Sequence, residues 1–294
     1  VAGTGLSGGG TSGAVTLNVE AAQSGVTSLG TLTALTVNGN VSIDGGTVKL
    51  DGNYPTGTNN VALGNTALDS LTSGNENTAI GAVALTANTS GCYNVAVGDN
   101  ALAANTTGND NTTIGMRSLL NNTTGINNTG VGRNALRENT TAAKNTAVGS
   151  SSLACNTTGT RNTAVGFCSL TTNTTGDDNT AFGTESLRAN TTGANNVAVG
   201  KNALVANTTG DENTAVGCNT LGANTTADNN TAIGAFALDT NTEGHSNVAV
   251  GRSALTANTT ADNNTAVGFS ALSSNTTGAD NAAFGRRALN SNTT

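Results

Sequence analysis

The sequence predicts an all-β protein, a β-solenoid, and three observations lead to that fold class. Glycine recurs every 17 residues from Gly64 to Gly285 without an insertion. The composition differs from that of a globular core, since the 294 residues include 39 Gly, one Pro and no Trp, and only 2% are aromatic. Charged residues make up 10%, too few to hold a chain open, and Val, Leu and Ile recur regularly, which argues against disorder. A fixed internal period outranks any local pattern in deciding the architecture.

The repeating unit reads N-T-A-V-G-x-x-A-L-x-x-N-T-T-G-x-x, and its fourteen copies occupy residues 60–294. Numbered 1 to 17, the unit has Asn at position 1, an apolar residue at position 4 and Leu at position 9 in every copy. A helical pair needs about 33 to 47 residues, and Gly, Asn and Thr disfavour a single helix. We therefore predict a parallel β-roll or β-helix of fourteen 17-residue coils. Each coil would carry two short strands, N-T-A-V and x-A-L-x. Coils about 4.8 Å apart would make a section roughly 65 Å long.

Large apolar side chains at positions 4 and 9 predict the core columns, a column being the file of residues at one position of successive units. Positions 3 and 4 point to opposite faces of a strand, so one row would face the interior and another a partner chain. We therefore expect self-association along the rod axis as a parallel homotrimer, with a dimer as the alternative. The predicted core columns include Val97, Val148, Val165, Val199 and Val216 at position 4, and Leu85, Leu102, Leu153, Leu204 and Leu255 at position 9.

Glycine marks the two predicted corners. At position 5 it occurs in every copy and is expected to supply a positive φ or a close backbone approach. At position 15 it is replaced in three copies by Ala142, Ala227 and Ala261, so a strict left-handed φ is not expected there.

Asparagine columns predict amide ladders along the rod, because an amide side chain both donates and accepts hydrogen bonds. The alternative is N-glycosylation, for which N-T-T at position 12 is a sequon; we favour the ladder. Position 12 is Asn in all copies but one, where Leu71 stands. The predicted ladder at position 1 includes Asn94, Asn145, Asn162, Asn196 and Asn213.

The strings N-V-A-V-G at 196–200 and 247–251 resemble the short repeats in the heads of trimeric autotransporter adhesins, which are trimers of parallel β-roll coils. The longer form with A-L-x-x-N-T-T-G resembles repeats of bacteriophage tail fibres and related viral fibre proteins. The resemblance covers residues 60–294, about four fifths of the chain. The 17-residue unit is longer than the adhesin head repeat, which leaves the handedness of the coil open.

Residues 1–59 form a separate Gly/Thr-rich segment with alternating apolar residues, which predicts short β-strands in a shaft or linker that also resembles phage fibre sequence. Asn38-Gly39 favours a two-residue hairpin, and strands intertwined from three chains are the alternative. The only proline, Pro55, marks the joint into the solenoid. Because the chain starts at Val1 and ends at Thr294 in the middle of a repeat, we expect a fragment of a longer chain.

No catalytic or metal-binding constellation emerges, so we expect neither an enzyme nor a cofactor. His245 is alone, and the four cysteines (Cys92, Cys155, Cys168 and Cys218) fall at different unit positions, which argues against zinc. Carboxylates gather at positions 16 and 17. They would form an acidic edge that either keeps rods soluble and apart or binds divalent cations. The net charge of -7 disfavours nucleic acid, and no apolar run reaches the roughly 18 residues of a membrane span.

The copies of the unit differ from one another mainly at positions 6, 7, 10 and 11. Exposed Phe near Arg would suit a recognition surface, and the same side chains could instead line a seam between chains. The candidate recognition residues are Arg117, Phe167, Phe236, Arg252, Phe269 and Arg286.

These observations favour a structural fibre protein, the shaft of a viral and more specifically phage tail fibre, located on the virion or otherwise extracellular. Its partners would be its own copies, other virion or fibre proteins and a host surface receptor, without nucleic acid or membrane. A bacterial surface adhesin or extracellular filament is the alternative. Ice binding by the threonines of positions 13 and 14 is a third hypothesis.

Overall fold

The computed structural model describes residues 6–7, 18–19 and 57–294. The chain divides into two compact units, Val1–Lys49 and Leu50–Thr294. In the first, β1 (Leu6–Ser7) and β2 (Asn18–Val19) pair antiparallel, with Leu6 opposite Val19. The predicted turn at Asn38-Gly39 and the predicted joint at Pro55 lie outside the described residues.

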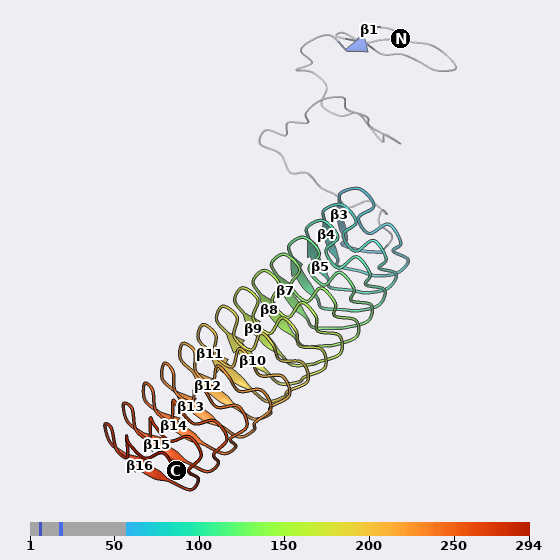
Figure 1. Ribbon diagram of the computed structural model, residues 1–294. Coiled ribbons are helices and arrows are strands. Elements are labelled where there is room, and N and C mark those ends of the chain that lie inside the picture. Colours follow the sequence, from blue (N-terminus) through green and yellow to red (C-terminus); the bar gives the residue numbers. More distant parts are fainter. Residues whose placement is uncertain (1–5, 8–17, 20–56) are drawn as a thin grey trace. The chain divides into compact units, whose positions relative to one another are not determined.

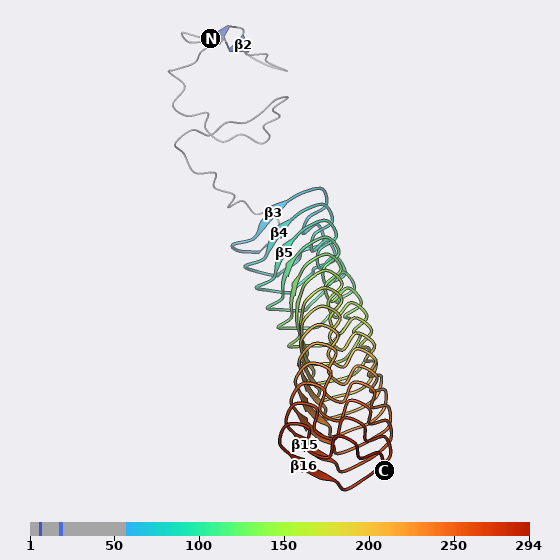
Figure 2. The same ribbon diagram turned by 60° about the vertical axis from the view of Figure 1, so that its left-hand side comes forward.

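The second unit is a parallel β-solenoid, which confirms the predicted fold class (Figure 1). Each coil contributes one three-residue strand from positions 2–4, and the fourteen strands form one sheet in chain order. Neighbouring strands pair with residues 17 apart opposite each other, as Thr163 with Thr180. Figure 2 shows the same stack from a second side. The strands are β3 (Val61–Leu63), β4 (Thr78–Ile80), β5 (Val95–Val97), β6 (Thr112–Ile114), β7 (Thr129–Val131), β8 (Thr146–Val148), β9 (Thr163–Val165), β10 (Thr180–Phe182), β11 (Val197–Val199), β12 (Thr214–Val216), β13 (Thr231–Ile233), β14 (Val248–Val250), β15 (Thr265–Val267) and β16 (Ala282–Phe284).

The prediction of a second strand, x-A-L-x, in each coil is wrong. Positions 6–11 form consecutive turns throughout residues 57–294. Positions 7 and 9 have positive φ in every coil, for example 61° at Val83 and 51° at Leu85. The Val83 N–H donates to Asn65 of the preceding coil at 2.8 Å, and the Leu85 N–H donates to Ala101 of the following coil at 3.1 Å. A left-handed residue costs about 1–2 kcal/mol, and these contacts between coils hold it in place.

The interior holds one large side chain per coil. Position 9 is fully buried in Leu85, Leu102, Leu153, Leu204 and Leu255, together with small residues, chiefly Ala, at positions 3 and 8.

The prediction that position 4 belongs to the core is wrong. Position 3 points inward, so strand alternation turns position 4 outward, and Val148 remains 37% exposed. The residues corrected are Val97, Val148, Val165, Val199 and Val216, which lie on the outside of the coil.

The asparagines of positions 1 and 12 are buried and hydrogen-bonded along the column. Asn162 donates its backbone N–H to Asn145 Oδ1 at 2.9 Å and its Nδ2 to the Gly176 carbonyl at 2.8 Å. Asn173, at position 12, donates Nδ2 to Asn156 Oδ1 at 2.9 Å and to the same Gly176 carbonyl at 3.0 Å. Each buried amide therefore has partners on both sides. The position-12 Nδ2 that a glycan would need is buried and bonded in the folded coil. Asn94, Asn145, Asn162, Asn196 and Asn213 all have zero exposure.

The two glycine corners differ as the sequence predicts. At position 5 every glycine has φ between 120° and 141°. A Cβ built on Gly183 would lie 2.6 Å from the Gly200 carbonyl oxygen of the next coil. Position 15 has no positive φ. Alanine stands there in Ala142, Ala227 and Ala261.

Truncating the interior leucine column should be far more costly than truncating its neighbour. Leu119→Ala removes a fully buried side chain and should destabilise the solenoid by about 2–5 kcal/mol. Leu120→Ala, one residue along at a half-buried position, is the matched control and should lose less than about 1.5 kcal/mol. Denaturant titration followed by circular dichroism measures both, and equal losses would contradict the assigned interior.

The same logic applies to the corners. Gly183→Ala should destabilise the coil by about 2 kcal/mol or more, because it combines a positive φ with a backbone clash. A Cβ on Gly193 would also lie close to a carbonyl oxygen, 2.5 Å from that of Gly210. However, Gly193 has no positive φ and alanine occurs at position 15 in other copies, so Gly193→Ala should cost less. Thermal melts compare the two, and a larger loss at Gly193 would show that the corners have been assigned the wrong way round.

Candidate interaction surface

The outer face of the sheet, defined as positions 2 and 4 of β3–β16, has an unbroken apolar column at position 4 beside a column at position 2 that is mostly Thr. Position 4 carries Val, Ile, Leu or Phe in every coil, and position 2 carries Thr, Val or, once, Ala. In-register parallel pairing places these side chains directly beside one another. Several are strongly exposed, with Phe182 at 56% and Ile114 at 46%. In other proteins, exposed apolar surfaces larger than a few hundred Å² are often sites of protein association.

Two charged edges flank the outer face. Positions 16 and 17 precede each strand and positions 6 and 7 follow it, so they lie along its opposite sides. We call positions 6 and 7 the basic edge, because within residues 57–294 it holds six cations and two carboxylates. These are Arg117, Arg133, Lys201, Arg252, Arg286 and Arg287 against Asp99 and Glu185.

Positions 16 and 17 form the acidic edge. Its nine carboxylates within residues 57–294 outnumber its two cations. The carboxylates are Glu76, Asp110, Asp177, Asp178, Asp211, Glu212, Asp228, Asp262 and Asp280, and the cations are Lys144 and Arg161.

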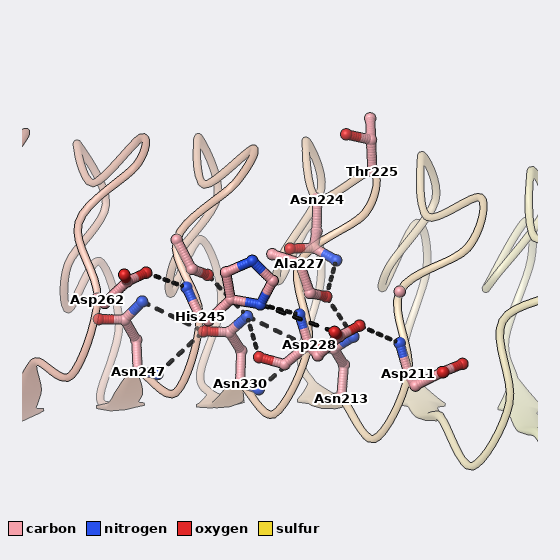
Figure 3. Close-up of polar contacts among 12 residues, drawn as sticks. Asp211, Asn213, Asn224, Thr225, Ala227, Asp228, Asn230, His245, Asn247 and Asp262 are labelled. Atoms are coloured by element: carbon pink, nitrogen blue, oxygen red, sulfur yellow. Dashed lines mark hydrogen bonds and ion pairs between the residues drawn. The ribbon is translucent and has the colours of Figure 1, made fainter.

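Side chains of position 16 accept hydrogen bonds from the backbone of the preceding coil (Figure 3). Asp211 N–H donates to Asp228 Oδ1 at 2.7 Å, and His245 N–H donates to Asp262 Oδ1 at 2.7 Å. Between them, Asp228 N–H donates to His245 Nδ1 at 2.9 Å, which requires an imidazole without a proton on Nδ1. His245 thus takes the place of a carboxylate in this row, as a structural acceptor.

The acidic edge shows no ready-made cation site. Within the part of the chain that the structure describes, no three His, Cys, Asp or Glu side chains converge into a group that could hold a metal ion. The four cysteines are unpaired thiols; Cys92, Cys155 and Cys168 are half-buried and Cys218 is exposed.

Two carboxylates have shifted pKa values. The hydrogen bonds from Arg161, at 2.6 and 2.7 Å, lower the pKa of Asp178, and the same contact raises the pKa of Arg161. This exposed pair adds little to stability. At position 10, burial raises the pKa of Asp239, and a hydrogen bond from the Gly222 backbone opposes that shift.

Three of the candidate recognition residues come together near the last coils. The Phe269 ring lies between two guanidinium groups, with Arg252 Cζ at 6.0 Å and Arg286 Cζ at 5.7 Å from its centroid. These cation–π contacts hold both charges at the surface. Arg117 and Phe167 lie at other levels of the basic edge, and Phe236 stands at position 7 one coil before Arg252.

Sequence reasoning predicted the acidic edge at positions 16 and 17 but named the basic residues one by one and missed the basic edge. The signal was present, because sorting Lys and Arg by unit position already separates them from Asp and Glu. The threonine column of position 13 was also incompletely understood. Its hydroxyls donate to the position-13 carbonyl of the next coil, as Thr157 to Thr174 at 3.0 Å, and this use of the donor does not favour ice binding.

No protein-family model matches the chain, and no curated protein or solved structure is significantly similar to it. Among the described residues we find no helix with the length and hydropathy to cross a membrane.

Removing the half-buried carboxylate at position 10 should change the pH dependence of stability. Burial raises the Asp239 pKa in the folded state, so the native protein loses stability as pH rises through that value. Asp239→Asn should therefore raise the melting temperature at pH 7, and the gain should vanish below the unfolded-state pKa of about 3.9. Asp280→Asn, an exposed carboxylate, is the control. A gain that persists at pH 3 would refute the desolvation account.

Proposed function

We propose that this chain is a structural fibre protein, the self-associating shaft of a viral and most specifically phage tail fibre, which supports host attachment from the virion. The observation that carries the proposal is the apolar position-4 column of the outer face, which continues over every coil from β3 to β16. An extended column with one regular interaction surface suits a mechanical spacer between two ends.

The thin interior supports self-association. From Leu68 to Leu272 one leucine per coil lies fully inside, while the large apolar side chain of position 4 stays at the surface. Covering that half-exposed side chain would contribute about 1 kcal/mol per coil. In a repeat protein such gains accumulate along the column, because each coil contacts only its neighbours.

A parallel homotrimer is the assembly that we propose. Three outer faces can meet around one axis parallel to the rod, which removes the apolar surface of all three copies from water. The resemblance to viral fibre and adhesin-head repeats favours the same arrangement. In this proposal the further partners are other virion or fibre proteins and a host surface receptor, and no catalysis or cofactor is involved.

The full chain should sediment at three times its mass of 28.6 kDa. The isosteric variant Val165→Thr/Val199→Thr/Val216→Thr buries three hydroxyls at the contact. It should raise the concentration of half-dissociation tenfold or more, since a buried unpaired hydroxyl costs about 1–3 kcal/mol. Val205→Thr, at the half-buried position 10 and away from the outer face and both edges, is the control in the same sedimentation experiment. A parent chain that stays monomeric up to millimolar concentration would remove the proposal.

The viral assignment is tested separately. Antibodies raised against the solenoid should label fibres on virus particles that encode this chain in immunogold electron microscopy. Labelling of a bacterial cell surface without virions would instead support an adhesin or extracellular filament.

A further inference from the structure

The outer face lies between two edges of opposite charge, and this arrangement goes beyond what a spacer needs. We infer that the basic edge of one copy binds the acidic edge of the neighbouring copy, so that electrostatic attraction fixes the parallel orientation of the assembly. The inference rests on the proposed self-association and specifies its partner surface, a second copy of this chain.

Symmetry makes the two edges complementary. When copies surround an axis parallel to the rod, the left side of one outer face adjoins the right side of the next, for two copies as for three. The edge at positions 6 and 7 then meets the edge at positions 16 and 17. In an antiparallel pair the same edges would meet like with like, and juxtaposed like charges oppose association.

We call one level of the stack a strand together with the acidic-edge residues before it and the basic-edge residues after it. Most cations of the basic edge have a carboxylate of the acidic edge at the same or an adjacent level. Arg117 follows β6 and Asp110 precedes it, while Arg286 follows β16 and Asp280 precedes it. Lys201 follows β11, and Asp211 and Glu212 precede β12. Arg252 follows β14 and Asp262 precedes β15. Arg133 is the cation whose own and next level lack a carboxylate.

Lys201, Arg252 and Arg286 can form ion pairs with a neighbouring copy. Among the ion pairs within residues 57–294, none involves Lys201, Arg252 or Arg286. All three are exposed, and the ring of Phe269 supports two of them.

Two of the exceptions to the charge pattern are neutralised inside the chain. Glu185, a carboxylate on the basic edge, lies 3.5 Å from Arg188 of position 10. Arg161, a cation on the acidic edge, forms the bidentate pair with Asp178. Neither therefore presents a free opposing charge to a neighbour.

Charge reversal with rescue tests the inference. Lys201→Glu/Arg286→Glu reverses the charge at two levels of the basic edge and leaves that edge with four cations and four carboxylates. Glu212→Lys/Asp280→Lys reverses the charge at two levels of the acidic edge and leaves seven carboxylates and four cations there. Each double variant should raise the concentration of half-dissociation about tenfold or more at low salt. The quadruple variant exchanges positive and negative charges at these four positions, so its concentration of half-dissociation should return towards that of the parent. Both residue types are tolerated locally, since Asp99 occurs at position 6 and Lys144 at position 17.

The control is Arg137→Glu, which shifts the net charge in the acidic direction at position 10, away from both edges. Arg188 is left in place because it pairs with Glu185 of the basic edge. Sedimentation equilibrium at about 0.05 M and 0.5 M salt measures all variants, and screening should shrink the differences at the higher concentration. Circular dichroism verifies that each variant keeps the coil.

The outcomes separate the inference from the proposed function. Reversal variants that assemble like the parent, or a quadruple variant without recovery, would overturn the charged seam and leave the self-associating shaft intact. A monomeric parent would overturn both. Weakening by each double variant, recovery in the quadruple variant and an unaffected control would support the seam.

Discussion

The buried amide hydrogen bonds of positions 1 and 12 impose the constraint on which the rest of the solenoid depends. Each amide bonds to its counterpart 17 residues away, and both amides of a coil share one carbonyl, as Asn162 and Asn173 share Gly176. An inserted or deleted residue would leave several of these groups buried without partners, at a cost of about 1–3 kcal/mol each. This requirement explains why the 17-residue period has no insertion or deletion.

A consequence of the amide columns is a narrow interior. With two Asn side chains and one Leu inside each coil, position 3 has room for Ala, Gly or Thr and position 8 for Ala, Ser or Thr. Strand alternation then places the large residue of position 4 outside. The apolar outer face thus follows from the same packing that closes the coil, and a thin coil gains most by covering it with another copy.

The sequence predicted the fold class, the coil length and the different behaviour of the two glycine corners, because these depend on period and on backbone stereochemistry. It failed for the second strand and for position 4. Leu85 and Val83 adopt positive φ, a conformation that propensity does not suggest for such side chains and that only contacts between coils stabilise. Val148 and Leu153 look equally apolar in the sequence, and which of them lies inside depends on the direction of the chain at the corner between them. The clustering of Arg252, Phe269 and Arg286 could be predicted from their shared unit position, whereas their ring contacts could not.

A column of identical coils has a weakness that its individual residues address. If every coil presented the same groups, a neighbouring copy could slide by one or more repeats and lose only the contacts at its ends. The outer face and its edges are not uniform, however. Phe182 and Phe284 project among valines and isoleucines, and the charges of the two edges change from coil to coil. A slipped neighbour would meet these side chains at the wrong level, so the variable positions give a translationally repetitive surface a preferred register. The fixed positions of the unit therefore build the coil, and the variable ones distinguish one level of the fibre from the next.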